Sequence, residues 1–277
     1  MVPATQTKPR DSVEASVPPA YLIMDTESVP DGRLLAAVKY AGENLPPDEA
    51  IRRAQADARE LSHTGSDFLP VTFQYPVAVC ILRVGGDFAL QKINRLGEPQ
   101  FQPRQIVEQF WSGLVQCKGR VKLVTFNGRG FDLPLLELSA FRYGCCGGDY
   151  FLNRNRYSGN HLDLMDWLSN FGALRMAGGL DVLAKLLGKP GKTSCSGDKV
   201  YHWLLEGKIK EINDYCMFDT LDTYFVFLRT RVMAGQLTLE KEHELVLKGK
   251  AFVQGQMDQY PALQQYLDNW GDWQPWP

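Results

Sequence analysis

A short apolar run that ends in two acids constrains the fold of this chain more than any other feature. Residues 21–28 read YLIMDTES, so apolar and aromatic side chains lead directly into Asp25, and Glu27 follows two residues later. Side chains alternate along a β-strand, so a strand here places both carboxylates on one face. Like charges that close repel each other unless water or a cation compensates them. The segment therefore predicts a buried strand that ends in solvated acids or in a metal site.

The composition is that of a globular protein with balanced charge. The chain has 277 residues, a hydrophobic fraction of 44% and a formal net charge of -2. These values predict a sizeable core in one domain with extensions, or in two small domains. The absence of a basic excess counts mildly against a high-affinity nucleic-acid binder. It leaves room for an enzyme whose acids are offset by bound metal.

The cysteines and the N-terminal segment bear on the compartment. Six cysteines are present without any CxxC spacing, and Cys145 and Cys146 are adjacent, so a zinc-ligand pattern is missing. Several of them lie in apolar runs, which favours free thiols, a reducing compartment and a cytoplasmic location. The N-terminus does not resemble a signal peptide, and no apolar run is long enough for a membrane span. We expect no membrane partner and a disordered tail over residues 1–18.

The N-terminal half alternates between strand and helix patterns. A polar insertion over about 40–70 contains a helix that starts near Pro46 and ends near Leu61. A strand, a GGD turn and a second strand over 76–96 predict a β-hairpin. Three further elements follow: a helix over 103–117, a strand over 121–128 ending in Asn127, and a helix from Phe131.

Helical patterns dominate the C-terminal half. Residues 145–160 are expected to form a loop, and 161–172 a strand that turns into a helix. Further helices are expected over 178–188, 211–235, 237–257 and, in short form before an aromatic tail, 260–277. This order of elements predicts an α/β fold in which helices flank a mixed β-sheet, with a helical C-terminal extension.

Acids recur at other positions that suit a shared site. Asp132 follows a predicted strand end, and Asp163 lies in HLDLMD. Asp219 lies one helical turn after Tyr215 in an apolar helix, where an uncompensated acid is costly. Oxygen ligands in this number suit magnesium or manganese, and two such ions about 3.5–4 Å apart support phosphodiester hydrolysis.

Three segments carry a family resemblance. DTE, FNGRGFD and YCMFD resemble, in order, the three motifs of the DEDD superfamily of 3′–5′ exonucleases, and the tyrosine is typical of its DEDDy branch. With HLDLMDWLS, PGKT and GDKV, the chain is similar to stand-alone proteins related to the proofreading exonuclease domain of family B DNA polymerases. This resemblance implies a ribonuclease H-like exonuclease domain over 19–235, with the helices and aromatic tail of 236–277 packed on it.

The resemblance also implies roles for individual residues. The metal ligands for two Mg²⁺ or Mn²⁺ ions would be Asp25, Glu27, Asp132 and Asp219. Tyr215 would orient the attacking water. The substrate-binding residues would be Thr26, Asn127, Phe131 and Lys192. Thr26 stands where the narrower family would have an aliphatic residue. The implied activity is hydrolysis of single-stranded nucleic acid, DNA rather than RNA, from a free 3′ end to nucleoside 5′-monophosphates.

Other interpretations of these residues stay open. Asp132 could be a helix N-cap, and Asp163 is better explained as the cap of the next helix than as a catalytic acid. Paired strand-end acids also occur in glycosidases, but the predicted hairpin contradicts a barrel of βα units. A catalytically weak nucleic-acid-binding module is the remaining rival. The Trp residues of the tail could stack on bases or pack on the domain.

The loop GKPGKTSCSGDK does not fit a nucleotide-binding P-loop. The Walker pattern requires a glycine where Leu186 stands, and the loop follows a predicted helix instead of a strand. Lys192 in this loop could still contact a phosphate backbone.

Overall fold

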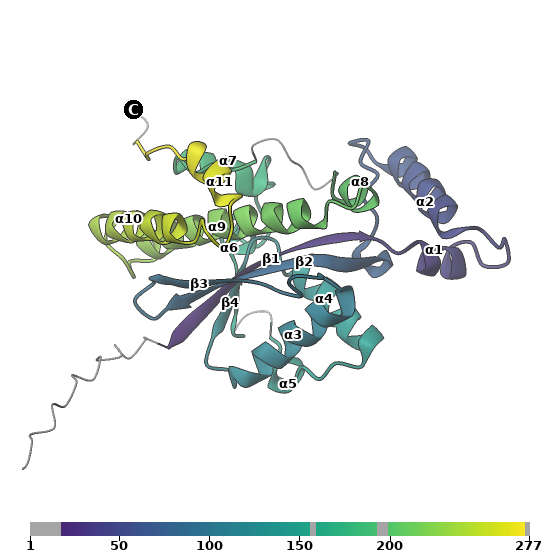
Figure 1. Cartoon of the computed structure of the whole chain (residues 1–277), viewed down its shortest axis with the longest axis horizontal. Coiled ribbons are helices and arrows are strands. Elements are labelled where there is room, and N and C mark those ends of the chain that lie inside the picture. Colours follow the sequence, from purple (N-terminus) through teal and green to yellow (C-terminus); the bar gives the residue numbers. More distant parts are fainter. Residues whose placement is uncertain (1–17, 156–158, 193–198, 275–277) are drawn as a thin grey trace, which may run out of the picture.

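A five-stranded mixed sheet forms the centre of the computed structural model, which describes residues 18–155, 159–192 and 199–274 (Figure 1). The predicted disorder of the N-terminal tail concerns residues outside these ranges. The strands run in the order β3-β2-β1-β4-β5. β1 pairs antiparallel with β2 and parallel with β4, β2 pairs antiparallel with β3, and β4 pairs parallel with β5. Their bounds are Pro19–Pro30, Gln74–Gly85, Leu90–Arg95, Lys122–Thr125 and His161–Asp163 for β1 to β5.

Helices cover both faces of the sheet, and the alternation of β1 decides which residues meet them. Ile23 belongs to a core shared with the long helix α9 (Ile209–Met233). Its neighbours Leu22 and Met24 belong to a second core, shared with α3 (Pro103–Gln116) and α4 (Asp132–Tyr143). Both cores consist of buried apolar side chains, so the sheet is a buried layer between two helical layers. The predicted α/β fold with a mixed sheet flanked by helices is confirmed.

The C-terminal segment packs against α9. α10 (Leu239–Gly255) and α11 (Leu263–Asp268) both contact this helix, and the backbone N–H of Gly271 donates to the carbonyl of Gly188 over 2.8 Å. The ring centroids of Trp270 and Phe225 lie 4.9 Å apart. Of the two roles considered for the tail tryptophans, this contact favours packing for Trp270. Trp276 lies outside the described residues.

The polar insertion and the short helix before it form a small helical unit with a core of its own. α1 (Gly32–Val38) and α2 (Pro47–Leu61) pack together through buried residues that include Leu35, Ile51 and Leu69. α2 starts and ends close to the predicted bounds, whereas α1 was not predicted. Figure 1 shows the pair at the end of the molecule toward which β1 runs.

Several predicted boundaries shift in the structure. β1 continues to Pro30, so Asp25 and Glu27 lie inside the strand and not at its end. β4 stops at Thr125 instead of Asn127, whose φ of 64° is incompatible with a strand. Short helices α5 (Asp149–Asn153) and α8 (Val200–Leu205) were not predicted. The predicted turn from strand to helix is present as β5 and α6 (Leu164–Leu168), and α7 spans Gly179–Leu186. None of the described helices combines the length and apolar character needed to cross a membrane.

Candidate metal centre and active site

The candidate site lies where the parallel pairing of β1 with β4 ends. Pairing of β1 with β4 runs from Tyr21 opposite Lys122 to Ile23 opposite Val124, and β4 ends one residue later. β1 itself continues beside β2 as far as Pro30. Asp25 and the residues after it therefore have a neighbouring strand on one side only. In α/β sheets, ligands bind beyond the carboxyl ends of parallel strands, at points of this kind.

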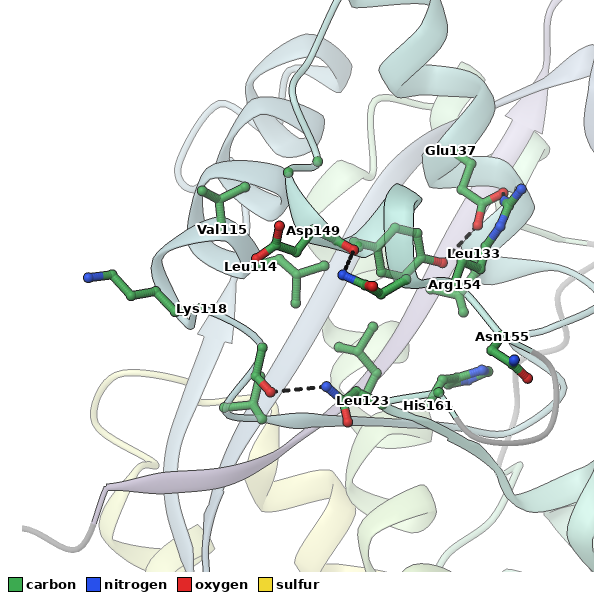
Figure 2. Close-up of a pocket in the computed structure, with 18 of the residues that line it drawn as sticks. Leu114, Val115, Lys118, Leu123, Leu133, Glu137, Asp149, Arg154, Asn155 and His161 are labelled. Carbon is green, nitrogen blue, oxygen red and sulfur yellow. Dashed lines mark hydrogen bonds and ion pairs between the residues drawn. The ribbon is translucent and has the colours of Figure 1, made fainter.

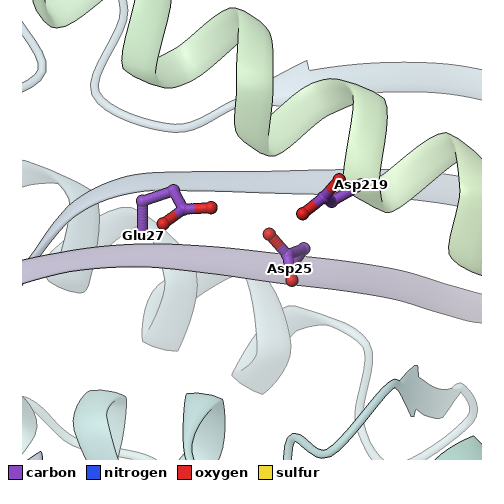
Figure 3. Close-up of side chains that lie close together, drawn as sticks. All are labelled: Asp25, Glu27 and Asp219. Carbon is purple, nitrogen blue, oxygen red and sulfur yellow. The ribbon is translucent and has the colours of Figure 1, made fainter. Parts of the chain in front are cut away.

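Three carboxylates meet at this opening (Figure 3). One oxygen from each of Asp25, Glu27 and Asp219 lies within 4.8 Å of the other two. The first two share a face of β1, and Asp219 approaches from α9, which crosses this face. The thiol of Cys216 donates to the backbone carbonyl of Asp25 over 3.3 Å, one helical turn before Asp219. This contact fixes α9 against the strand and places Asp219 opposite the two acids of β1.

Asp132 reaches the same region from the opposite helical layer. It is the first residue of α4, is 3% exposed, and accepts a hydrogen bond of 2.7 Å at Oδ1 from the hydroxyl of Thr26. Phe131 holds the N-cap position of α4 and no side chain caps the helix there, so the N-cap alternative for Asp132 is wrong. The Thr26 side chain is buried and its hydroxyl is engaged, which favours a supporting role over the expected contact with substrate.

The pKa of each of the four acids is raised. Burial is the main cause for each, and it holds the pKa of Asp25 and Glu27 well above the ordinary carboxyl range. For Asp25 the charges of Asp132, Glu27 and Asp219 add to this effect, in that order. Burial also raises the pKa of Asp132 to about 7 and that of Asp219 to about 6. Such a cluster cannot hold all its negative charges at neutral pH without a compensating cation.

The donor set fits a divalent cation. Oδ2 of Asp25 is buried and has no hydrogen-bond partner among the described residues, although a buried carboxylate oxygen normally has one. The surrounding donors are carboxylate oxygens, which Mg²⁺ and Mn²⁺ prefer. A cation bound among the three carboxylates would compensate their charge and could satisfy this buried acid.

Tyr215 lies beside the cluster on α9. Its ring is 7% exposed and packs edge-on against Trp203, with 6.3 Å between the ring centroids. Its hydroxyl lies near the carboxylate of Asp219 and lowers the pKa of that acid. Burial and the neighbouring negative charges raise the pKa of Tyr215, so its hydroxyl stays protonated and can donate at neutral pH.

The residues expected to contact substrate surround the acids at different depths. Asn127 is exposed, and its backbone N–H donates to Asp163 Oδ1 over 2.9 Å. Phe131 is half-buried next to Asp132. Lys192 is exposed; its backbone N–H donates to Asp181 Oδ1 over 2.7 Å, and its charge lowers the pKa of Glu27 and Asp219. The next residues of that loop lie outside the described ranges.

Two further acids act away from the cluster. Asp163 caps α6 by accepting from the backbone N–H groups of Met165 and Asp166, as predicted, and it also braces the loop before α4. Asp222 follows Asp219 by three residues on α9. It is fully buried and accepts a hydrogen bond of 2.7 Å from the hydroxyl of Tyr266 in α11. No local pattern indicates this partner, which lies 44 residues away along the chain.

A separate cavity of about 910 Å³ lies among α3, α4, α5 and β4 (Figure 2). Leu123 and Leu133 contribute apolar walls, and Glu137 accepts hydrogen bonds from Tyr150 and Arg154 on its rim. His161, on β5, also lines it; burial and the nearby Arg129 lower its pKa to about 4, so it is neutral at physiological pH. None of the four acids lines this cavity, so it is distinct from the candidate metal centre.

The chain belongs to a known family. Residues 66–270 match the family described as predicted 3′–5′ exonuclease related to the exonuclease domain of PolB. No curated protein and no solved structure is significantly similar to the chain. The match includes Asp132, Tyr215 and Asp219 but starts after β1. The structure is what brings Asp25 and Glu27 to Asp219.

Proposed function

We propose that the chain is a metal-dependent 3′–5′ exonuclease that hydrolyses single-stranded nucleic acid, preferably DNA, to nucleoside 5′-monophosphates. The observation that carries this proposal is the meeting of Asp25, Glu27 and Asp219 within 4.8 Å, at the open end of the β1–β4 pair. Family membership supplies the reaction class, and the acid cluster supplies a place where a divalent cation can bind.

Four acids would hold the metal. Asp25, Glu27 and Asp219 surround one position, and Asp132, supported by Thr26, lies near enough to Asp25 for its charge to raise the pKa of that acid. This arrangement suits two Mg²⁺ or Mn²⁺ ions. When bound, such ions lower the pKa of water and neutralise charge on a phosphodiester during displacement.

The neighbouring residues would position the reactants. Tyr215 is expected to orient the attacking water through its hydroxyl, which stays protonated and lies against Asp219. Asn127 and Phe131 precede Asp132 at the surface and would hold the end of the strand, and Lys192 would contact a phosphate. Restricting the water and the scissile phosphate to one geometry lowers the entropic part of the barrier.

An assay with labelled DNA tests the proposal. Single strands labelled at the 5′ end should shorten stepwise from the 3′ end in Mg²⁺ or Mn²⁺, and chelation should stop the reaction. Asp25→Asn should lose several orders of magnitude in rate, because a metal ligand is removed. Asp149→Asn, which changes an exposed acid on the rim of the separate cavity, should retain the wild-type rate.

Three outcomes would contradict the proposal. Undiminished hydrolysis in chelator would show that the reaction needs no metal. Efficient cutting of closed circular single strands would indicate an endonuclease. Tight binding of single strands without any turnover in either metal would favour the nucleic-acid-binding module.

A further inference from the structure

An exposed aromatic ring from the insertion lies beside the acid site. Phe68 is 58% exposed and contacts Phe131, with 5.6 Å between the ring centroids and 54° between the ring planes. Phe131 directly precedes the acid Asp132. The insertion thus places a phenyl ring next to a residue of the candidate site.

The backbone behind this ring is anchored to the strand that carries the acids. Leu69 is 4% exposed in the core of the insertion, and its carbonyl accepts a hydrogen bond of 2.5 Å from Nε2 of Gln74. The amide oxygen Oε1 of Gln74 accepts a hydrogen bond from the hydroxyl of Ser28, the residue after Glu27. The segment that carries Phe68 is therefore fixed relative to the metal centre.

Packing alone does not account for the position of this ring. More than half of Phe68 faces solvent, and such exposure returns little hydrophobic stabilisation to the fold. Other phenyl rings are exposed too, such as Phe141 at 88%, so exposure by itself signals nothing. Phe68 differs from them because it pairs with a second ring at the site and because its backbone is tied to β1.

We propose that Phe68 and Phe131 form a base-binding site that holds an unpaired base near the 3′ end of the strand. This inference rests on the proposed function and specifies how the strand is recognised. A phenyl ring offers an apolar face to any nucleobase, so the site binds by stacking and tolerates every sequence. Because a base in a duplex is already stacked and paired, the site also selects single-stranded ends.

Substrates that lack one base test this site directly. Single-stranded DNA with one abasic position, placed first, second or third from the 3′ end, is compared with the intact strand. For the wild type, one of the three positions should lower kcat/KM about tenfold, which is the order of one base–aromatic stack. Phe68→Ala should lower kcat/KM about tenfold on intact DNA, mainly through KM. In this variant, removal of the base at the sensitive position should lower kcat/KM much less than it does in the wild type.

Controls separate stacking from a general defect. Phe68→Tyr keeps an aromatic face and should restore most of the loss. Phe141→Ala should behave as the wild type. It removes an exposed ring near the C-terminal end of α4, whose N-cap is Phe131. Thermal unfolding should show that all variants fold. The inference is overturned if Phe68→Ala cleaves intact DNA as the wild type does, or if it keeps the full penalty at all three positions.

A binding measurement distinguishes failure of the base site from failure of the proposed function. In an Asp219→Asn background, affinity for labelled intact and abasic strands is measured by fluorescence anisotropy. If the wild type proves inactive but Phe68→Ala weakens binding of intact strands alone, the base site stands without the exonuclease. If the Asp219→Asn protein binds intact and abasic strands equally, with and without Phe68→Ala, the base site is disproved. The exonuclease proposal is then still decided by the cleavage assay with labelled DNA.

Discussion

The hydroxyl of Thr26 donates a hydrogen bond of 2.7 Å to Asp132, joining β1 to α4 across 106 residues of chain. Both side chains are buried, and Thr26 points away from the face that carries Asp25 and Glu27. The bond directly links the strand that supplies two of the acids to the helix that supplies a third. Its removal should therefore disturb the geometry of the site without removing an acid.

Thr26→Val preserves the shape of the side chain but removes the donor. We expect activity or metal affinity to fall about 10- to 100-fold, the usual effect of losing a residue that orients a metal ligand. Thr26→Ser keeps a hydroxyl and should recover most of the activity. Titration of activity against Mg²⁺ measures both quantities, and a valine variant with wild-type rate and metal dependence would show that the bond has no functional role.

The raised pKa values of the acids predict how stability of the metal-free protein depends on pH. Carboxyl groups in an unfolded chain titrate near pH ~4, whereas the pKa of Asp219 is about 6 and that of Asp132 about 7 in the folded protein. The folded state thus binds more protons, so its stability is greatest below the unfolded pKa and is lost as pH rises through the folded values. In chelator, Tm should fall between pH 5 and pH 8.

Two comparisons check the origin of this pH dependence. Saturating Mg²⁺ should raise Tm most at pH 8, where the acids are charged. Asp25→Asn should make Tm in chelator less sensitive to pH, because the variant removes one of the mutually repelling charges. A Tm in chelator that rises from pH 5 to pH 8 would contradict the assignment of these acids to one cluster.

Tyr215→Phe removes the hydroxyl that lies against Asp219 and leaves the ring in place. If the hydroxyl orients the attacking water, kcat should fall about tenfold to a thousandfold while KM and metal binding change little. Tyr215→Ala should additionally destabilise the fold by about 3 kcal/mol through the cavity it leaves beside Trp203. Full activity of the phenylalanine variant would show that the Tyr215 hydroxyl has no role in the reaction and that the side chain serves only in packing.

Tyr266→Phe tests the attachment of the C-terminal helix. Its hydroxyl is the hydrogen-bond donor to Oδ1 of Asp222, whose other oxygen has no partner among the described residues. Leaving this buried acid without its donor should lower the free energy of unfolding by about 1–3 kcal/mol. Denaturant unfolding measures the change.

A double mutant supplies the control for this bond. In an Asp222→Leu background, the further change Tyr266→Phe should cost much less, because the acid that needs the hydroxyl is gone. Equal costs in both backgrounds would show that the hydroxyl stabilises the fold independently of Asp222.

Local patterns of the sequence were sufficient for most of the fold. The hairpin of β2 and β3 follows from two apolar runs around a GGD turn, and α3 from its apolar stripe. Asp219 stood out because an acid in the middle of an apolar helix is costly without a partner. Each of these signals lies within a single element, where periodicity and burial are coupled.

The parts that could not be predicted depend on contacts between distant segments. α1 and α5 have 7 and 5 residues, too few for a periodic pattern to stand out. The end of β4 at Thr125 is set by the loop that Asp163 holds through the backbone N–H groups of Asn127 and Arg129. The partners of Thr26 and Asp222, and the place of Phe68, follow from how the layers meet and leave no mark in the local sequence.

The contact between Cys216 and the carbonyl of Asp25 joins residues 191 positions apart and brings α9 against β1. Chains emerge from the ribosome N-terminus first, and domains generally fold as units once they are available. Asp25 and Glu27 are therefore synthesised long before the helix that provides Asp219. A nascent chain carries two acids of an incomplete site until α9 has been synthesised, and the candidate centre can assemble only after that helix has emerged.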